Sequence, residues 1–190
     1  MTTVSSSKPR LQRPDWVLAG FRALVRGGAE ALRIEPIARD LGATKGSFYW
    51  HFKDLSDLKQ AMLEAWETLA TTEITAAVRR SGLPGADQVM LLVDKVSVVP
   101  EAEAGGTAIE PAIRDWGRVD PMARSVLERV DAQRLADLRD FLGSAGLGPD
   151  RAAEGAIRFY AAVIGLESLR LTCGIDMRAG LRAVAEAILT

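Results

Sequence analysis

Hydrophobic residues along this chain recur mainly at intervals of three and four positions, which is the spacing of one face of an α-helix. The alternation typical of a β-strand is nearly absent. Only residues 96–99 resemble a strand, and we interpret them as a helix end that runs into extended chain before Pro100. The pattern therefore predicts an all-α fold of about nine helices.

Three of these helices are short and lie close together in the first third of the chain. The spacing predicts them over residues 15–27, 34–41 and 45–52. Gly42 is suited to stop the second helix, and Thr44 to cap the third. Two short helices joined by a glycine turn are typical of a helix-turn-helix, whose second helix enters the major groove of DNA.

The remaining helices are longer and predict a helical bundle. Asp54 is placed to cap a helix that we expect to continue to Arg80, and residues 101–106 are expected to form a loop. The predicted bundle helices cover residues 54–80, 89–96, 109–116, 121–142, 150–171 and 176–188.

Composition excludes several classes of protein. Hydrophobic residues make up 48% of the 190 residues and charged residues 26%, which is the balance of a globular protein and excludes a disordered chain. One cysteine and one histidine are too few for a metal site or a disulfide within one chain, and we expect neither a cofactor nor enzyme activity. Because the chain has neither an apolar stretch of membrane-spanning length nor a secretory signal, we expect a cytoplasmic protein without membrane contact.

The distribution of charge matters more than its sum. A net charge of −1 at first argues against a nucleic-acid partner. However, residues 1–53 hold nine basic and four acidic residues, a net charge of +5, and the remainder holds 15 basic and 21 acidic residues, a net charge of −6. We expect residues 1–14, with Lys8, Arg10 and Arg13, to be a flexible basic arm. A basic end and an acidic body would orient the protein on a duplex.

The third predicted helix has an unusual outward surface. Phe48 and Phe52 lie one turn apart and are expected to be buried, so the other side chains point outward. These combine a cation, hydroxyl groups and aromatic rings, which suit contact with DNA. The alternative is a packed helix triplet whose aromatic patch binds protein, as part of an interaction module without DNA binding. The candidate DNA contacts are Thr44, Lys45, Gly46, Ser47, Tyr49, Trp50, His51 and Lys53.

Residues 37–52 read Ile-Ala-Arg-Asp-Leu-Gly-Ala-Thr-Lys-Gly-Ser-Phe-Tyr-Trp-His-Phe. This Ile-Ala pair, glycine turn and Tyr-Trp-His-Phe ending, followed by a capped long helix, resembles the TetR-type (tetracycline-repressor-like) transcriptional regulators. The resemblance covers residues 15–66. It implies that DNA is touched by Lys45, Gly46, Ser47, Tyr49 and His51.

The resemblance also implies a domain organisation and a function. It implies a helix-turn-helix domain over residues 15–53, and a bundle over residues 54–190 that binds a small molecule and dimerises. Such a protein is a transcriptional regulator, commonly a repressor, that leaves a palindromic operator in double-stranded DNA when its effector binds. The family commonly has a lysine where this chain has Leu55, so Lys53 or the amides of the long helix are expected to hold that phosphate.

Candidates for the effector pocket are the large apolar or aromatic residues on the central helices, although each also suits an ordinary core. We expect Arg114, Asp115 and Arg118 to face water or to pair with each other. The candidate lining residues are Met90, Val93, Ile113, Trp116, Phe141 and Tyr160.

The penultimate helix carries more apolar surface than one core-facing stripe requires, and Ala161 and Gly165 on it would let a second helix approach closely. We therefore expect it to form a homodimer interface. The candidate interface residues are Phe159, Val163, Leu166 and Leu169.

Overall fold

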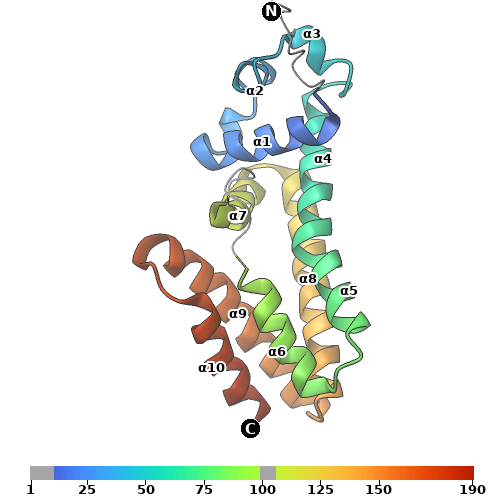
Figure 1. Cartoon of the computed structure of the whole chain (residues 1–190), viewed down its shortest axis with the longest axis vertical. Coiled ribbons are helices and arrows are strands. Elements are labelled where there is room, and N and C mark those ends of the chain that lie inside the picture. Colours follow the sequence, from blue (N-terminus) through green and yellow to red (C-terminus); the bar gives the residue numbers. More distant parts are fainter. Residues whose placement is uncertain (1–10, 99–105) are drawn as a thin grey trace, which may run out of the picture.

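The computed structural model describes residues 11–98 and 106–190, which form helices joined by short turns, with no strand among them (Figure 1). The α-helices are α1 (Arg13–Gly27), α2 (Ile34–Asp40), α3 (Lys45–Phe48), α4 (Leu55–Glu67), α5 (Glu73–Arg80), α6 (Gly85–Val96), α7 (Ile109–Val119), α8 (Pro121–Ser144), α9 (Pro149–Cys173) and α10 (Met177–Leu189). A π-helical turn, Thr68–Thr72, joins α4 to α5 without a break. Counted as one helix, α4–α5 leaves nine α-helices in the described part of the chain, as predicted.

Local sequence signals placed most helix ends correctly. The Asp54 side chain accepts a hydrogen bond from the backbone N–H of Asp57 at 2.9 Å, and the helix that it caps reaches Arg80. Residues 96–98 are the end of α6 and a following turn, so the interpretation as a helix end is confirmed, whereas extended chain is not seen up to residue 98 and residue 99 lies outside the described residues. The expected loop over 101–106 lies outside the described residues except for Gly106, and so do residues 1–10 of the expected arm.

The molecule is elongated, with α1–α3 at one end and α6, α9 and α10 at the other (Figure 1). The continuous α4–α5 helix runs along one side, and α8 lies behind it, so these two connect the ends. Helix α7 lies in the middle, beneath α1 and packed against α8. It is therefore one of the elements through which the N-terminal helices contact the rest of the bundle, together with α4.

Buried side chains at the N-terminal end form one cluster that continues beyond residue 53. Trp16, Phe48 and Phe52 are fully buried in it, together with Ile113 and Trp116 of α7. Three helices of this length bury too little surface to be stable alone. The first three helices therefore share their core with α4, α7 and the first turns of α8.

A second cluster fills the opposite end, between α5, α6, α8, α9 and α10. Gly155 allows α9 and α10 to approach closely, because a Cβ atom at this position would lie 2.7 Å from Ile188 Cγ2. None of the described helices is long and apolar enough to cross a membrane.

Candidate nucleic-acid interface and interior polar cluster

Helices α2 and α3 and the turn between them have helix-turn-helix geometry. Gly42 adopts a left-handed conformation, φ +62°, that ends α2. Thr44 then caps α3, and its Oγ1 accepts the backbone N–H of Ser47 at 3.1 Å. Regular α-helix ends at Phe48, earlier than the predicted residue 52, and the chain continues in tight turns up to His51. The prediction of a full helix over 45–52 is therefore corrected to one turn of helix followed by further turns.

Aromatic packing holds α3 against α1. Phe48 stacks on Phe52 with ring centroids 5.4 Å apart, and Trp16 meets Phe48 edge-on at the same distance. Both phenylalanines are buried, as predicted. Arg13 donates to the His51 carbonyl oxygen at 2.7 Å, and its guanidinium lies 4.2 Å from the Phe52 ring. The expectation that the flexible arm extends to residue 14 is therefore wrong at its end, because Arg13 begins α1 and ties it to the recognition segment.

The predicted DNA contacts form one outward surface on this base. Trp50 is 84% exposed and Tyr49 51% exposed, although aromatic rings are normally covered. Ser47 and His51 are half-buried. The other predicted contacts, all exposed, are Thr44, Lys45, Gly46 and Lys53.

Lys45 is held within this surface by a carboxylate. Its Nζ lies 3.1 Å from Glu35 Oε1, and both side chains are exposed. The hydrogen bond to Glu35 raises the pKa of Lys45 above its ordinary value. The Lys45 ammonium group, beside exposed aromatic rings, can bind a phosphate once its ion pair with Glu35 is broken.

The structure around Gly46 and Leu55 shows what packing within the chain requires at these two positions. A Cβ at Gly46 would lie 3.7 Å from Thr44 Oγ1, an ordinary contact, so packing within the chain does not require glycine there. Leu55 packs against the N-terminal cluster in the first turn of α4. Two residues before Leu55, the backbone N–H of Lys53 donates to Asp57 Oδ2 at 2.9 Å, and the Lys53 side chain is exposed.

A group of charged and polar side chains that sequence reasoning missed lies between the two hydrophobic clusters. We call it the interior polar cluster, and it consists of Glu110, Arg114, Asp131, Arg134 and Tyr160. Glu110 Oε1 accepts from Arg134 Nη1 at 2.8 Å and from Arg114 Nη2 at 2.9 Å. The Tyr160 hydroxyl accepts from both arginines and donates to Asp131 at 2.5 Å. The cluster thereby connects α7, α8 and α9.

Arg134 extends this cluster to the long helix. Its Nη2 donates to the Ala70 carbonyl oxygen at 3.2 Å and its Nε to Thr71 Oγ1 at 2.9 Å, both within the π-helical turn. A π-helical turn displaces the regular backbone hydrogen bonds, so a side-chain donor is useful there. Trp66 of α4 also donates to Glu110, at 3.1 Å. Four helices therefore meet at the Arg134–Glu110 ion pair.

Two carboxyl groups in this region differ in their titration. Burial acts to raise the pKa of Glu110, but the charges and hydrogen bonds of Arg134 and Arg114 outweigh it and hold that pKa below its usual value. Glu167 of α9 is paired less closely, 3.9 Å from Arg170 Nη2. Burial and the nearby charge of Glu110 raise the pKa of Glu167 to about 7.

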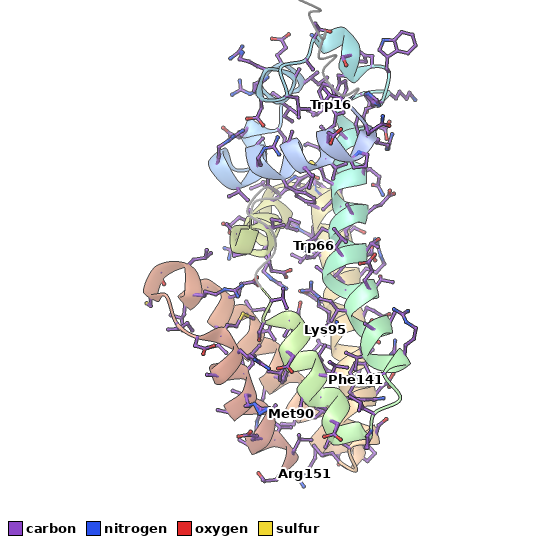
Figure 2. All side chains as sticks on the ribbon, viewed as in Figure 1. Trp16, Trp66, Met90, Lys95, Phe141 and Arg151 are labelled. Atoms are coloured by element: carbon purple, nitrogen blue, oxygen red, sulfur yellow. The ribbon has the colours of Figure 1, made fainter. Side chains whose placement is uncertain are left out.

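The candidate lining residues do not surround one cavity. Ile113 and Trp116 belong to the N-terminal cluster, whereas Val93, Phe141 and Tyr160 belong to the second cluster. Met90 packs against that second cluster, and Figure 2 shows Met90 and Phe141 at the end of the molecule opposite Trp16. The expectation of a shared pocket lined by these six residues is corrected, because most of them are ordinary core.

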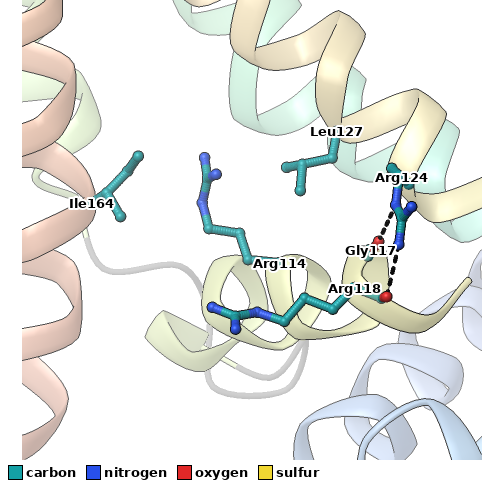
Figure 3. Close-up of a pocket in the computed structure, with 6 residues that line it drawn as sticks. All are labelled: Arg114, Gly117, Arg118, Arg124, Leu127 and Ile164. Carbon is teal, nitrogen blue, oxygen red and sulfur yellow. Dashed lines mark hydrogen bonds between the residues drawn. The ribbon is translucent and has the colours of Figure 1, made fainter.

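A hollow of about 540 Å³ lies elsewhere, between α7, α8 and α9 (Figure 3). The expectation that Arg114 faces water or pairs with Asp115 or Arg118 is wrong, because it bonds within the interior polar cluster. The expectation for the exposed pair Asp115 and Arg118, 3.5 Å apart, is confirmed. The residues that line the hollow are Arg114, Gly117, Arg118, Arg124, Leu127 and Ile164.

The predicted interface residues on α9 face different directions. Phe159 is 1% exposed in the core of its own chain, so its assignment to an interface is corrected. Val163 and Leu166 are half-buried against the second cluster, and Leu169 is 47% exposed. The exposed face of α9 instead carries Ala161 and Gly165. The exposed face of the adjacent α10 carries small residues at similar spacing, Ala179, Ala183 and Ala187.

Comparison with known proteins agrees with this geometry. Residues 17–65 match the family model described as bacterial regulatory proteins, tetR family. No curated protein sequence matches the chain significantly. The solved structure of a protein from Rhodococcus sp., described as a TetR-family transcriptional regulator, aligns with a TM-score of 0.77 at 22% identity, over 94% of this chain and 98% of that one.

Two further solved structures contain a ligand. A transcriptional regulator from Saccharomonospora viridis in complex with choline aligns with a TM-score of 0.74 at 17% identity, over 93% of this chain and 94% of the other. The regulator FadR from Bacillus subtilis in complex with stearoyl-CoA aligns with a TM-score of 0.72 at 13% identity, over 94% and 98%. At these identities the similarity establishes the fold, which extends over nearly the whole chain.

Proposed function

We propose that this protein is a dimeric DNA-binding transcriptional regulator controlled by a small molecule. The premise is that residues 17–65 belong to the tetR family of bacterial regulatory proteins. The observation that carries the proposal is the exposed surface of Lys45, Tyr49 and Trp50 on a buried aromatic base. Exposed aromatic rings gathered beside a cation are typical of an interaction site. Repression, with release from the operator when the effector binds, is the mode that we propose.

Electrostatics supports DNA as the partner of this surface. The N-terminal residues 1–53 carry a net charge of +5 and the remainder −6, so the potential favours approach of a duplex by the recognition end. We propose that Lys45 and Lys53 contact phosphates, and that Ser47, Tyr49 and His51 contact phosphates or base edges.

Variants of the recognition surface test this assignment. Duplexes selected from a random pool and labelled with a fluorophore report affinity by anisotropy over a range of salt concentrations. Lys45→Ala should weaken binding and reduce the slope of log affinity against log salt by about one, because one phosphate contact is lost. Tyr49→Ala should weaken binding about tenfold or more. Glu35→Gln should strengthen binding, because it releases Lys45 from its ion pair.

The matched control is Arg139→Gln, which removes an exposed arginine on α8 whose Nε donates to the Leu135 carbonyl oxygen of its own helix, outside the recognition surface and the proposed dimer interface. Its affinity should equal that of the unmodified protein. Affinity that barely changes with salt, or that is unaltered in both Lys45→Ala and Tyr49→Ala, would instead support the alternative of a protein-interaction module.

A dimer would place two recognition helices on one face of the duplex, about 34–36 Å apart. We propose that the small residues on the exposed faces of α9 and α10 form its interface, since they permit close helix packing. Gly165 is the informative position, because a Cβ there meets nothing within 4 Å in the monomer. The fold therefore tolerates a large side chain at this position, and such a side chain would obstruct only a second chain.

Gly165→Arg should accordingly convert a dimer of twice the 20.5 kDa chain mass into a monomer in light scattering, with loss of operator affinity. The control is Gly143→Arg on α8, an exposed helical glycine whose Cβ would also meet nothing within 4 Å. It should remain a dimer. A monomeric unmodified protein at micromolar concentration, or an intact Gly165→Arg dimer, would contradict the proposed interface.

A small-molecule effector is the remaining part of the proposal. Two structural relatives were solved with choline and with stearoyl-CoA, so this fold accommodates ligands of very different size and charge. In the present chain, α7 packs against both the N-terminal cluster and the interior polar cluster. We propose that a ligand acting on α7 changes the position of the recognition helices.

A further inference from the structure

We propose that the hollow between α7, α8 and α9 binds a small organic anion with an apolar body. Its lining consists of three arginines, one glycine and two aliphatic side chains, and none of these six residues is acidic. A volume of about 540 Å³ is within the range of small-molecule sites. The proposal deepens the proposed function, because it names the class of the effector and the place where it binds.

The three arginines present different donors to this space. Arg114 reaches between Ile164 and Leu127 (Figure 3), and its buried Nε has no hydrogen-bond partner among the described residues. Arg118 is largely exposed and is restrained by a 3.5 Å contact with the equally exposed Asp115. A buried donor without an acceptor is costly, so movement of Arg114 toward an anion in the hollow would give this N–H an acceptor.

Arg124 is fixed in place by the end of α7. Its Nε donates to the Gly117 carbonyl oxygen at 3.1 Å and its Nη2 to the Arg118 carbonyl oxygen at 2.8 Å. These are carbonyl groups of the last turn, where a helix favours a cation. The Arg124 guanidinium is thereby held at the hollow by neutral carbonyl groups, with N–H groups left for a ligand.

The apolar side of the hollow determines the rest of the ligand. Leu127 and Ile164 face each other across it from α8 and α9 (Figure 3). Gly117 keeps α7 close to α8, because a Cβ at this position would lie 3.1 Å from Leu127 Cδ2. An aliphatic or aromatic body can pack on these two side chains beside Arg114, whereas an inorganic anion would leave them uncovered. A carboxylate on a short hydrocarbon chain has both properties.

Arg114 connects this site to the rest of the protein. The same guanidinium donates to Glu110 and Asp131 at 2.9 Å, and Glu110 holds the Arg134 that reaches the long helix. An anion that attracts Arg114 competes with these two carboxylates. Since α7 also packs beneath α1, the competition is transmitted to the recognition end.

Binding of octanoate, octanamide and octylammonium to the full chain tests the proposal, because these probes share one hydrocarbon chain and differ in charge. Titration calorimetry at constant ionic strength should give octanoate at least about tenfold higher affinity than either of the others, from its charge-assisted hydrogen bonds. Arg118→Gln should lower octanoate affinity about threefold to tenfold, and Arg118→Glu more, with octanamide affinity unchanged. Arg118 is exposed, so neither variant threatens folding.

Arg139→Gln and Arg139→Glu are the matched controls, since Arg139 is likewise an exposed arginine and lies on α8 outside the hollow and outside the proposed dimer interface. Both should bind octanoate as the unmodified protein does. Equal affinity for octanoate and octanamide, an octanoate Kd weaker than about 1 mM, or full affinity in Arg118→Glu would overturn the anion site. DNA binding is measured separately without octanoate, so its absence would overturn the regulator function and leave the result for the anion site standing.

Discussion

Replacing Arg134 with methionine should lower the free energy of unfolding by about 3–5 kcal/mol, the cost of removing one partner from a buried ion pair. Arg134 and Glu110 are both nearly buried, with side chains 13% and 11% exposed. Without the guanidinium, Glu110 keeps Arg114 and Trp66 as donors but carries a less compensated charge. The Ala70 carbonyl oxygen in the π-helical turn also loses a donor.

Chemical denaturation measures this difference directly, and Arg129→Met is its matched control. Arg129 lies on the same helix, α8, and also pairs with the long helix, through two hydrogen bonds to Glu67 of 2.6 and 2.9 Å. Its side chain is 54% exposed, so its removal should cost less than about 1 kcal/mol. Equal losses from the two variants would show that the interior position of Arg134 gives it no special role.

Replacing Glu167 with glutamine should stabilise the protein at pH 8 by about 2–3 kcal/mol. Burial and the charge of Glu110 raise the pKa of Glu167 to about 7 from 4.5. Between these two values the folded protein binds more protons than the unfolded chain, so the stability from this group is present below pH 4.5 and is lost as pH rises through 7. Glutamine resembles the neutral carboxyl and removes that loss.

Denaturation at pH values between 5 and 8 distinguishes this effect from a general change in packing. The difference between Glu167→Gln and the unmodified protein should be small at pH 5 and should grow towards pH 8. Glu154→Gln, an exposed glutamate on the same helix, should leave the pH dependence unchanged. A Glu167→Gln difference that is the same at every pH would contradict the raised pKa.

Both predictions concern the region where the long helix changes its hydrogen-bonding pattern. The π-helical turn Thr68–Thr72 lies beside the interior polar cluster and midway between the recognition end and the second hydrophobic cluster. The ion pair of Glu110 and Arg134 therefore contacts the element that connects the two ends.

Much of the fold was predictable because its signals are local. Gly42, Thr44 and Asp54 act within three or four residues of themselves, through backbone conformation and capping hydrogen bonds, so their effects follow from sequence spacing. The outward position of Tyr49 and Trp50 follows from the burial of Phe48 and Phe52 in the same turns. These short-range relations explain why the helix-turn-helix and most helix boundaries were recognisable.

The predictions that failed depend on partners distant in the sequence. Phe159 appeared available to a second chain because the apolar spacing on α9 is compatible with two apolar faces, one for the core and one for a partner. In the structure, the packing of its own bundle covers Phe159. Arg114 appeared solvent-exposed on its own helix, but Asp131 and Tyr160 arrive beside it from α8 and α9. Arg13 likewise finds the His51 carbonyl group only after α1 and α3 have packed together.

The sequence by itself determined an all-α chain with a helix-turn-helix, a basic first third and an outward recognition surface, because helix periodicity, capping and charge are properties of neighbouring residues. Only the tertiary structure decided which charges are buried together and where a hollow remains. Glu110 and Arg134 are far apart along the chain, and their ion pair exists because α7 and α8 pack side by side. Such pairing depends on the positions of whole helices, which hydrophobic spacing alone leaves open.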